Sequence, residues 1–271
     1  MPEPVVSLVV TCYNYARFLP GLFASLAAQS VGPGAMELVF VDDASDDGSL
    51  EAARTLGRDV PFAATRFLAT EGLRRPGPVR SLGFDAASAE RIGYVDADDL
   101  LEPRFLESCL DAIDAGADLA YTGNVRQTPE GEDVLVLPAV DAETLRTQNI
   151  VTSPCVMRRE VWRALDGFRA ETTYEDWDFW VQAAAAGFAF ARVPEPLHRH
   201  RGHDANYSIT AEADDGRAKA LIVTENGRFF APEVRHWARA LLRGEAWAGP
   251  LTRGLIPRAE DVRGMRGRPG A

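Results

Sequence analysis

The first half of the chain alternates short strand-like runs with helical ones, and this alternation limits the folds open to it. Val5–Thr11 is a continuous apolar run rich in β-branched residues, as expected of a strand buried on both faces. Apolar residues then recur at spacings of three and four across 18–26, which predicts an amphipathic helix. Further strands are expected at 37–41, 62–68, 91–95 and 119–125, and further helices at 50–56, 78–89 and 103–115.

This order of elements predicts an α/β sandwich, in which helices cover both faces of a mostly parallel sheet. Sheets of that kind bind ligands beyond the carboxyl ends of their strands, so the residues that follow each strand are the informative ones. At 271 residues, 46% of them hydrophobic, the chain is long enough for one large domain with an appendage.

Composition excludes several classes of protein. The net charge of −11 argues against nucleic acid as a partner, because phosphate binding needs a basic surface. The three cysteines, Cys12, Cys109 and Cys155, are too widely spaced for a zinc pattern or a disulfide framework. No apolar run reaches the ~20 residues of a membrane span, and the first residues lack the basic segment of a signal peptide. We therefore expect a cytoplasmic protein with buried free thiols.

Two of the predicted strands end in acidic clusters. The first cluster is Asp42-Asp43-Ala44-Ser45-Asp46-Asp47-Gly48-Ser49, and the second is Asp96-Ala97-Asp98-Asp99. Carboxylates packed together repel each other, so each cluster needs a cation or hydrogen-bond donors. Oxygen ligands of this type suit Mg²⁺ or Mn²⁺, and an Asp-x-Asp at the end of a strand presents two carboxylates on one face.

Other interpretations of the clusters remain open from these residues alone. The first cluster also resembles a calcium loop counted from Asp43, but its twelfth position is Arg54, where a glutamate is required. Ser45, Asp46 or Asp47 could instead cap the helix that follows. The second cluster could be a solvated turn without a metal. Neither cluster identifies a function by itself.

Four short motifs in a fixed order resemble glycosyltransferase family 2, whose members have the GT-A fold. The resemblance spans about residues 5–208 and implies a GT-A-type α/β/α sandwich with a mostly parallel, mixed central sheet, plus a C-terminal helical extension. The motifs are Thr11-Cys12-Tyr13-Asn14, the segment Val41-Asp42-Asp43-Ala44-Ser45-Asp46-Asp47-Gly48-Ser49, the segment Tyr94-Val95-Asp96-Ala97-Asp98-Asp99 followed by Pro103, and the segment Thr173-Tyr174-Glu175-Asp176-Trp177-Asp178-Phe179-Trp180.

The resemblance implies a binding site for a nucleotide-diphospho-sugar donor. A tyrosine would stack on the base, a carboxylate would accept from a ring N–H, and arginines would contact the phosphates. The segment around Arg80 departs from the family pattern, with Val79 and Ser81 in place of Ala and Asn, so Arg80 could equally be a surface residue. The implied nucleotide-binding residues are Thr11, Tyr13, Asp43, Arg80, Asp96 and Arg201.

The resemblance also implies a metal site formed by Asp98, Asp99 and His203, with Mn²⁺ or Mg²⁺ as the ion. The cation would act as a Lewis acid that neutralises the diphosphate leaving group. His200 stands where the family often has a tyrosine. Taken without the family, His198, His200 and His203 suggest zinc, but no cysteine or other ligand lies near them in the sequence.

Asp176 is the implied general base, which would take a proton from the acceptor hydroxyl as it attacks the anomeric carbon. Glu175 is the alternative base. Both carboxylates could instead serve only to stabilise a helix N-terminus, where the helix dipole favours negative charge. Trp177 and Trp180 on the same predicted helix are expected in the core rather than as platforms for a sugar.

The family resemblance thus implies an inverting, metal-assisted transfer of a sugar to a hydroxyl of a glycan or lipid-linked acceptor, with a UDP-sugar as the favoured donor. The alternative is a catalytically silent nucleotide-sugar-binding module that assists a partner glycan synthase. A sugar-nucleotide pyrophosphorylase is disfavoured, because Thr11–Pro20 lacks the Gly-rich basic loop that such an enzyme needs.

We expect three parts in the chain: a catalytic domain at 1–210, a helical extension at 211–250, and a flexible tail rich in Arg, Gly and Pro at 251–271. The extension contains predicted helices at 215–226 and 232–243, and the second of these could pack on the domain or pair with a second copy. The arginines of the tail could contact an anionic membrane surface at the inner membrane face.

Overall fold

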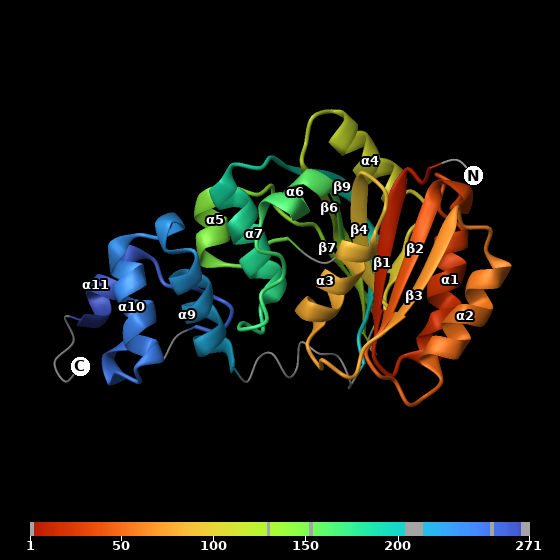
Figure 1. Cartoon of the computed structure of the whole chain (residues 1–271). Helices are drawn as coiled ribbons and strands as arrows, with labels where there is room; N and C mark the ends of the chain where they lie inside the picture. The colour runs from red at the N-terminus through yellow and green to blue at the C-terminus, as the bar shows by residue number, and fades with distance from the viewer. Residues whose placement is uncertain (1–2, 129–130, 152–153, 204–213, 250–251, 267–271) are drawn as a thin grey trace. The chain divides into compact units, whose positions relative to one another are not determined.

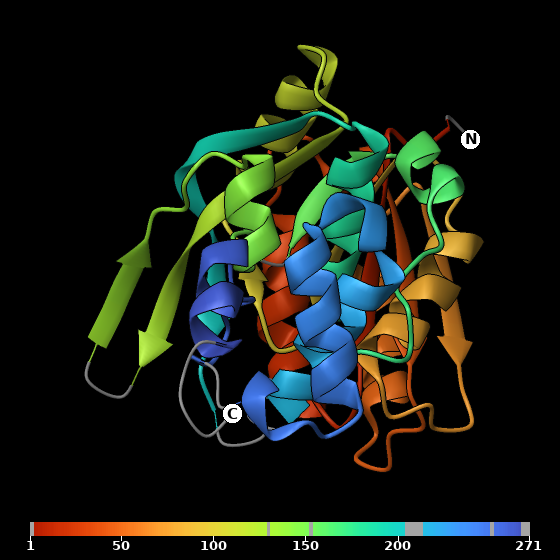
Figure 2. The ribbon, with the colours of Figure 1, turned by 90° about the vertical axis from the view of Figure 1, so that its left-hand side faces the viewer.

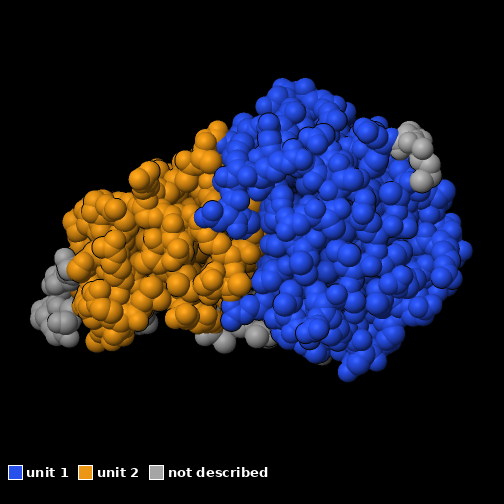
Figure 3. All heavy atoms as spheres, viewed as in Figure 1, with its two compact units in different colours: residues 1–139, 152–167, 188–202 blue, residues 140–151, 168–187, 203–271 orange. Residues whose placement is uncertain are grey.

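The computed structural model describes residues 3–128, 131–151, 154–203, 214–249 and 252–266. Within them the chain forms two compact units, which Figure 3 shows in blue and orange. The division differs from the predicted boundary at residue 210, because two internal segments pack with the C-terminal helices. Unit 1 contains Met1–Ala139, Thr152–Gly167 and Phe188–Gly202, and unit 2 contains Val140–Val151, Phe168–Gly187 and His203–Ala271.

The described strands all belong to unit 1 and form one nine-stranded mixed sheet (Figure 1). They are β1 (Val6–Cys12), β2 (Met36–Asp42), β3 (Ala64–Ala69), β4 (Arg91–Asp96), β5 (Leu100–Leu101), β6 (Leu119–Thr128), β7 (Gly131–Leu135), β8 (Cys155–Arg158) and β9 (Phe190–Arg201). Their order is β3-β2-β1-β4-β8-β6-β9-β5, with β7 paired to β6.

The first four strands are parallel neighbours, as the sequence predicts. The later strands make the sheet mixed: β8 runs antiparallel between β4 and β6, whereas β6 and β9 are parallel. β7 extends β6 as an antiparallel hairpin, and Figure 2 shows these two strands side by side in yellow-green.

Helices cover both faces of this sheet. On one face, alternate β1 residues such as Leu8 and Val10 join apolar side chains of α1, α2 and α4 in one buried cluster. On the other face, Val9 lies against α3. Neighbouring residues of a strand point to opposite faces, so the continuous apolar run of β1 contributes to both layers. The helices of unit 1 are α1 (Leu19–Ala27), α2 (Ser49–Asp59), α3 (Pro76–Ala86), α4 (Phe105–Asp114) and α6 (Arg159–Ala164), with the 3-10 turns η1 (Ala16–Phe18) and η2 (Pro33–Ala35).

The described secondary structure of unit 2 is helical. Among the described residues, no helix combines the length and the apolar character needed to cross a membrane. Trp237 is fully buried, and its indole donates to the carbonyl of Ala248 at 2.8 Å, so this side chain packs within the unit. The helices are α5 (Ala142–Thr147), α7 (Glu175–Ala186), α9 (Asp215–Glu225), α10 (Pro232–Leu242) and α11 (Ala259–Arg266), with the 3-10 turns η4 (Gly227–Phe229) and η5 (Ala246–Ala248).

The structure differs from the flexible tail predicted at 251–271. Residues 259–266 form α11, and the side chains of Ile256 and Val262 are 2% and 1% exposed. The N–H of Ile256 donates to the carbonyl of Thr147 at 2.8 Å. Isolated apolar residues therefore anchor this segment. They form no periodic pattern in the sequence, because arginines and glycines surround them. Residues 267–271 lie outside the described residues.

Helix α3 approaches the sheet closely at Gly83. A β-carbon at this position would lie 2.3 Å from Cγ1 of Val9 and 3.2 Å from Cγ2 of Val41, both of which are fully buried. Carbon atoms do not tolerate the first distance, so a side chain here would push the helix off the sheet. The glycine therefore sets the distance at which α3 presents Arg80 to the sheet.

We expect Gly83→Ala to reduce the free energy of unfolding by about 1–3 kcal/mol, because overpacking a rigid core is destabilising. Gly264→Ala is the matched control, since Gly264 lies in α11 with no described atom within 4 Å of the added β-carbon. This control should be neutral or stabilising by up to about 1 kcal/mol. Urea denaturation of both variants measures the difference, and equal stabilities would contradict the close packing.

Candidate active site

Three neighbouring parallel strands end at the same edge of the sheet, and each carries a polar residue there. The register pairs Thr11 of β1 with Asp96 of β4, and Cys12 of β1 with Asp42 of β2. The hydroxyl of Thr11 donates to Oδ1 of Asp96 at 3.0 Å. Motifs that are far apart in the sequence are thereby brought together.

Asp96 is also held by Arg80, which reaches it from α3. Nη2 of Arg80 lies 2.9 Å from Oδ1 and 2.8 Å from Oδ2 of Asp96, and its guanidinium carbon lies 4.7 Å from the ring centroid of Tyr94. Arg80 is 5% exposed, so the alternative that it is a surface residue is wrong. This charge-assisted contact fixes the orientation of the Asp96 carboxylate.

Asp43 shapes the loop that follows β3. Its Oδ1 accepts from the N–H of Leu73 at 2.6 Å and from the hydroxyl of Thr70. Its Oδ2 accepts from the N–H of Arg74 at 2.7 Å. Tyr13 lies beside this loop with 41% of its surface exposed, and the guanidinium carbon of Arg74 lies 3.9 Å from its ring centroid. The result is an exposed aromatic ring next to a loop held in place by a buried carboxylate.

Three non-glycine residues near this loop have a positive φ angle: Asn14 at 56°, Ala44 at 57° and Arg74 at 57°. The left-handed conformation costs an L-residue roughly 1–2 kcal/mol. Backbone strain of this kind is concentrated at ligand-binding and catalytic sites. It therefore agrees with a ligand site at the ends of β1 and β2.

Asp42 and Asp47 of the first cluster organise the backbone through their side chains. Oδ1 of Asp47 accepts from the N–H of Ser49, the first residue of α2, at 3.0 Å. Its Oδ2 accepts from the N–H of Ala16 at 2.9 Å. Oδ2 of Asp42 accepts from the N–H of Ser45 at 3.0 Å. Asp47 thus serves the helix N-terminus as the capping interpretation predicts, although the N-cap residue itself is Gly48.

The second acidic cluster, Asp96-Ala97-Asp98-Asp99, forms a turn at the end of β4, called here the acidic turn. Its last two aspartates are buried, so the solvated-turn alternative is wrong. Asp98 and Asp99 are 5% and 4% exposed. Burial raises the pKa of Asp98 to about 7, and the negative charges of Asp99 and Asp96 contribute to the same shift. A carboxyl group in such surroundings is stabilised by a proton or by a nearby cation.

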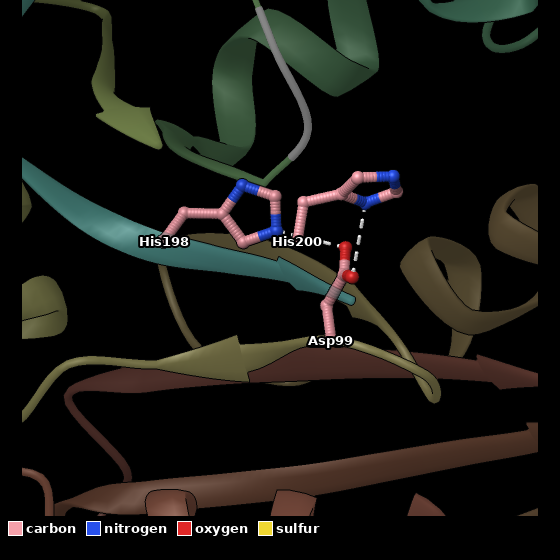
Figure 4. Close-up of side chains that lie close together, drawn as sticks. All are labelled: Asp99, His198 and His200. Carbon is pink, nitrogen blue, oxygen red and sulfur yellow. Dashed lines mark hydrogen bonds and ion pairs between the residues drawn. The ribbon is translucent and has the colours of Figure 1, made fainter. Parts of the chain in front are cut away.

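Asp99 is paired with two histidines of β9 (Figure 4). Its Oδ2 lies 2.8 Å from Nε2 of His198, and its Oδ1 lies 3.2 Å from Nδ1 of His200. Burial would raise the pKa of Asp99, but the attraction and hydrogen bonds of His198 and His200 outweigh it and hold that pKa well below its usual range. The hydrogen bond to Asp99 in turn raises the pKa of His200.

The three side chains form a candidate metal centre. Asp99, His198 and His200 offer a carboxylate oxygen and two imidazole nitrogens that all lie within 4.8 Å of one another. No further ligand lies near these histidines in the sequence, but the fold places the carboxylate of Asp99 beside them. Of the predicted ligands, Asp98 and Asp99 lie at this turn, whereas His203 belongs to unit 2 and its part in the site stays a prediction.

Arg201 connects the acidic turn to neighbouring main-chain groups through hydrogen bonds. Its guanidinium donates to the carbonyl oxygens of Asp98, of Asp99 at 3.4 Å and of Phe18 at 3.3 Å. Its main-chain N–H donates to Oδ1 of Asp99 at 3.2 Å. A phosphate contact of Arg201 stays a prediction, and these bonds give Arg201 a role in holding the turn.

Glu175 and Asp176, called here the Glu-Asp motif, are the first two residues of helix α7 in unit 2. Oδ2 of Asp176 accepts from Nδ2 of Asn149 at 2.9 Å, and Oδ1 accepts from the N–H of Trp177 at 2.7 Å. Glu175 is 6% exposed, whereas Asp176 is half-buried. The greater exposure of Asp176 favours it over Glu175 as a base, and its place in the first turn also agrees with the helix-dipole alternative.

A network of hydrogen bonds and one ion pair holds Tyr174, the residue directly before this motif. Nζ of Lys219, the only lysine in the sequence, lies 2.5 Å from Oδ2 of Asp215 and donates to the carbonyl of Thr252 at 3.0 Å. Oδ1 of Asp215 accepts from the hydroxyl of Tyr174 at 2.9 Å and from the N–H of Gly254 at 2.8 Å. The network ties the residue that precedes the motif to α9 and to the segment after residue 252.

We expect Lys219→Met to lower the free energy of unfolding by about 3 kcal/mol at pH 7, because it leaves Asp215 without its buried cation. Burial raises the pKa of Asp215, but the hydrogen bond from Lys219 and the other donors outweigh it and lower that pKa overall. The stabilisation by the Lys219–Asp215 pair is therefore complete above the pKa of Asp215 in the unfolded state, which is about 4. It is lost as the pH falls toward the lower pKa of Asp215 in the folded state.

Stability curves at pH 7, 5, 4 and 3 test this expectation. The wild-type protein should lose more stability than Lys219→Met between pH 5 and pH 3. Arg243→Met removes an exposed ion pair of the same unit and should change stability by less than about 1 kcal/mol. Parallel pH profiles for the wild type and Lys219→Met would contradict the role given to the Lys219–Asp215 pair.

The sequence matches the profile described as Glycosyl transferase family 2 over residues 7–151, which is more than half of the chain. The chain belongs to glycosyl transferase family 2. It is 33% identical over 109 residues to an uncharacterized glycosyltransferase of Nostoc sp., covering 40% of this chain and 32% of that protein. It is 26% identical over 212 residues to the chondroitin synthase of Pasteurella multocida, covering 76% of this chain and 21% of that protein. The chain thus spans a third or less of the length of these curated relatives.

Solved structures resemble this family 2 chain in fold. TarS 1–349 of S. aureus in complex with UDP-GlcNAc gives a TM-score of 0.67 at 20% identity, over 81% of this chain and 66% of that one. The mannosyltransferase PcManGT from Pyrobaculum calidifontis, in complex with GDP-Man and Mn²⁺, gives a TM-score of 0.67 at 19% identity, over 93% and 77%. The chain therefore has the GT-A-type mixed α/β fold that its motifs imply.

Several residues of the site carry no clear signal in the sequence. Asn149, Lys219 and Asp215 belong to no motif, and only the fold places them around the Glu-Asp segment. His198 and His200 do carry a signal, since two histidines separated by one residue point to the same face if the segment is a strand. That signal becomes specific only when Asp99 is known to lie opposite them.

Proposed function

We propose that this family 2 chain catalyses an inverting, metal-assisted transfer of a sugar from a nucleotide-diphosphate donor to a hydroxyl of a glycan or lipid-linked acceptor. The observation that carries the proposal is the contact of Thr11 and Arg80 with Asp96, beside the buried acidic turn at the carboxyl ends of β1 and β4. Parallel α/β sheets bind nucleotides at this edge. The sugar nucleotides in the TarS and PcManGT complexes support the same class of donor.

The nucleotide base is assigned to Tyr13 and Asp43. Tyr13 has Arg74 over one ring face, so the other face can stack on a base. Asp43 already accepts three hydrogen bonds, and an ionised carboxylate has about four acceptor positions, which leaves capacity for a ring N–H. UDP is the favoured nucleotide, in line with the UDP-GlcNAc complex of TarS.

The cation is assigned to the acidic turn. Asp98 and Asp99 supply oxygen ligands, His198 and His200 add nitrogen ligands from β9, and His203 is added by the family resemblance. A mixed oxygen and nitrogen set suits Mn²⁺ better than Mg²⁺, which prefers oxygen alone. When bound, a divalent cation offsets the negative charge of the diphosphate leaving group. Burial and the negative charges of Asp99 and Asp96 raise the pKa of Asp98, and a bound cation would offset both effects.

Asp176 is assigned as the general base of a single displacement. Its carboxylate receives hydrogen bonds from the amide of Asn149 and the N–H of Trp177, which orient it without neutralising its charge. It would take the proton of the acceptor hydroxyl as that oxygen attacks the anomeric carbon. Glu175 is the alternative base.

Asp176→Asn should lower turnover by about 10²- to 10⁴-fold, the usual contribution of a general base, and leave donor affinity unchanged. The assay is nucleotide release from UDP-GlcNAc and GDP-mannose with Mn²⁺, with water or hexose oligosaccharides as acceptors. Glu175→Gln is the matched control and should lose less activity. Full turnover in Asp176→Asn would contradict the assignment, whereas nucleotide binding without turnover in the wild type would favour a silent binding module.

Calorimetric titration of UDP, GDP and dTDP, each with and without Mn²⁺, tests the donor site. One nucleotide should bind, and more tightly with the ion. His200→Ala should lower the apparent Mn²⁺ affinity roughly 10- to 100-fold, as loss of a metal ligand or its support does. His236→Ala, which removes a histidine stacked on Trp247, should have no such effect. Absence of binding to any nucleotide by the folded protein would overturn the donor-site assignment.

A further inference from the structure

Two hydrogen bonds described for the carboxylate of Asp176 come from different places, one from its own helix and one from a separate segment. The first donor is the N–H of Trp177, the residue that follows Asp176. This donor is therefore available to any aspartate at position 176. Nδ2 of Asn149, at 2.9 Å from Oδ2, belongs to the segment that follows α5. The second contact therefore depends on how that segment is attached to α7.

Two buried indoles attach the segment to α7 on either side of Asn149. Nε1 of Trp177 donates to the carbonyl of Leu145 at 2.8 Å, and Nε1 of Trp180 donates to the carbonyl of Val151 at 3.1 Å. Both tryptophans are almost completely buried, so they are core residues, as the sequence predicts. The backbone between the two attachment points thus has a fixed position relative to the first turn of the helix that carries Asp176.

Asn149 itself has no packing role comparable to that of its neighbours. Leu145, Ile150 and Val151 are 0%, 5% and 1% exposed and anchor the segment, whereas Asn149 is exposed. An exposed asparagine between buried anchors contributes little to the packing of the segment. Its one described side-chain contact is directed at the carboxylate of Asp176.

We propose that Asn149 is a positioning residue that fixes Oδ2 of Asp176 for proton abstraction from the acceptor hydroxyl; the inference rests on the proposed function of Asp176. An amide suits this task better than a cation. Arg or Lys at hydrogen-bond distance would stabilise the charged carboxylate and reduce its basicity, whereas a neutral amide orients it and leaves it a competent base. The buried indoles make this orientation persistent, because they restrict the segment on both sides.

Asn149→Ala should lower kcat roughly 10- to 100-fold, the range expected for loss of a hydrogen bond to a charged group. The KM for the sugar nucleotide and the melting temperature should stay unchanged, because the side chain is exposed and touches neither the proposed donor residues nor the core. Gln148→Ala is the matched control from the same segment and should retain full kcat. Asn149→Ser, which keeps a short donor, should recover part of the lost rate.

A double-mutant cycle separates positioning from a general structural effect. Asn149→Ala combined with Asp176→Asn should be as slow as Asp176→Asn alone, because the asparagine acts only through the carboxylate. The assay is the nucleotide release from UDP-GlcNAc and GDP-mannose described above. Multiplicative losses in the double variant, or an unchanged kcat in Asn149→Ala, would overturn the proposal while leaving Asp176 as the base. Full turnover in Asp176→Asn would overturn the base assignment and the positioning role with it.

Discussion

Burial of the acidic turn after β4 is the constraint on which the proposed donor site depends. An unpaired carboxylate in such surroundings would cost several kcal/mol, so Asp99 needs compensating charge. Ring nitrogens of His198 and His200 lie 2.8 and 3.2 Å from its carboxylate oxygens, and these contacts join β9 to the turn. Arg201 then follows on β9 and binds the backbone of the turn. One buried carboxylate thus connects the end of the parallel strands to a strand that comes about a hundred residues later in the chain.

The carboxylates of unit 2 differ in their partners, and this difference distinguishes structural groups from the proposed base. Asp178 is 1% exposed, and burial raises its pKa in spite of the opposing charge of Arg169. Asp215 is paired with the buried Lys219. Asp176 is half-buried like Asp215, but the two donors described for Asp176 are the neutral groups of Asn149 and Trp177. These donors orient the carboxylate of Asp176, and a fixed orientation is what proton abstraction by the proposed base requires.

The sequence predicts the first half of the fold well, because there each element is specified by its own residues. The apolar run of β1 and the spacing of apolar residues in α1 and α4 are local patterns, and the structure contains the corresponding elements. β8 and β9 are not predicted, since β8 is short and β9 is interrupted by prolines and charged residues. Their pairing with β4 and β6 is decided by contacts between distant segments, which no local pattern records.

The sequence by itself determined the family motifs, the sheet with helices on both faces, and the acidic residues at the strand ends. It could do so because strand and helix periodicity, and the residue types of a motif, are properties of contiguous residues. Only the tertiary structure decided which groups contact the acidic residues of the site: Arg80 contacts Asp96, His198 and His200 contact Asp99, and Asn149 contacts Asp176. The physical reason is that ion pairs and hydrogen bonds depend on distances of about 3 Å between groups far apart in the chain, and folding alone sets those distances.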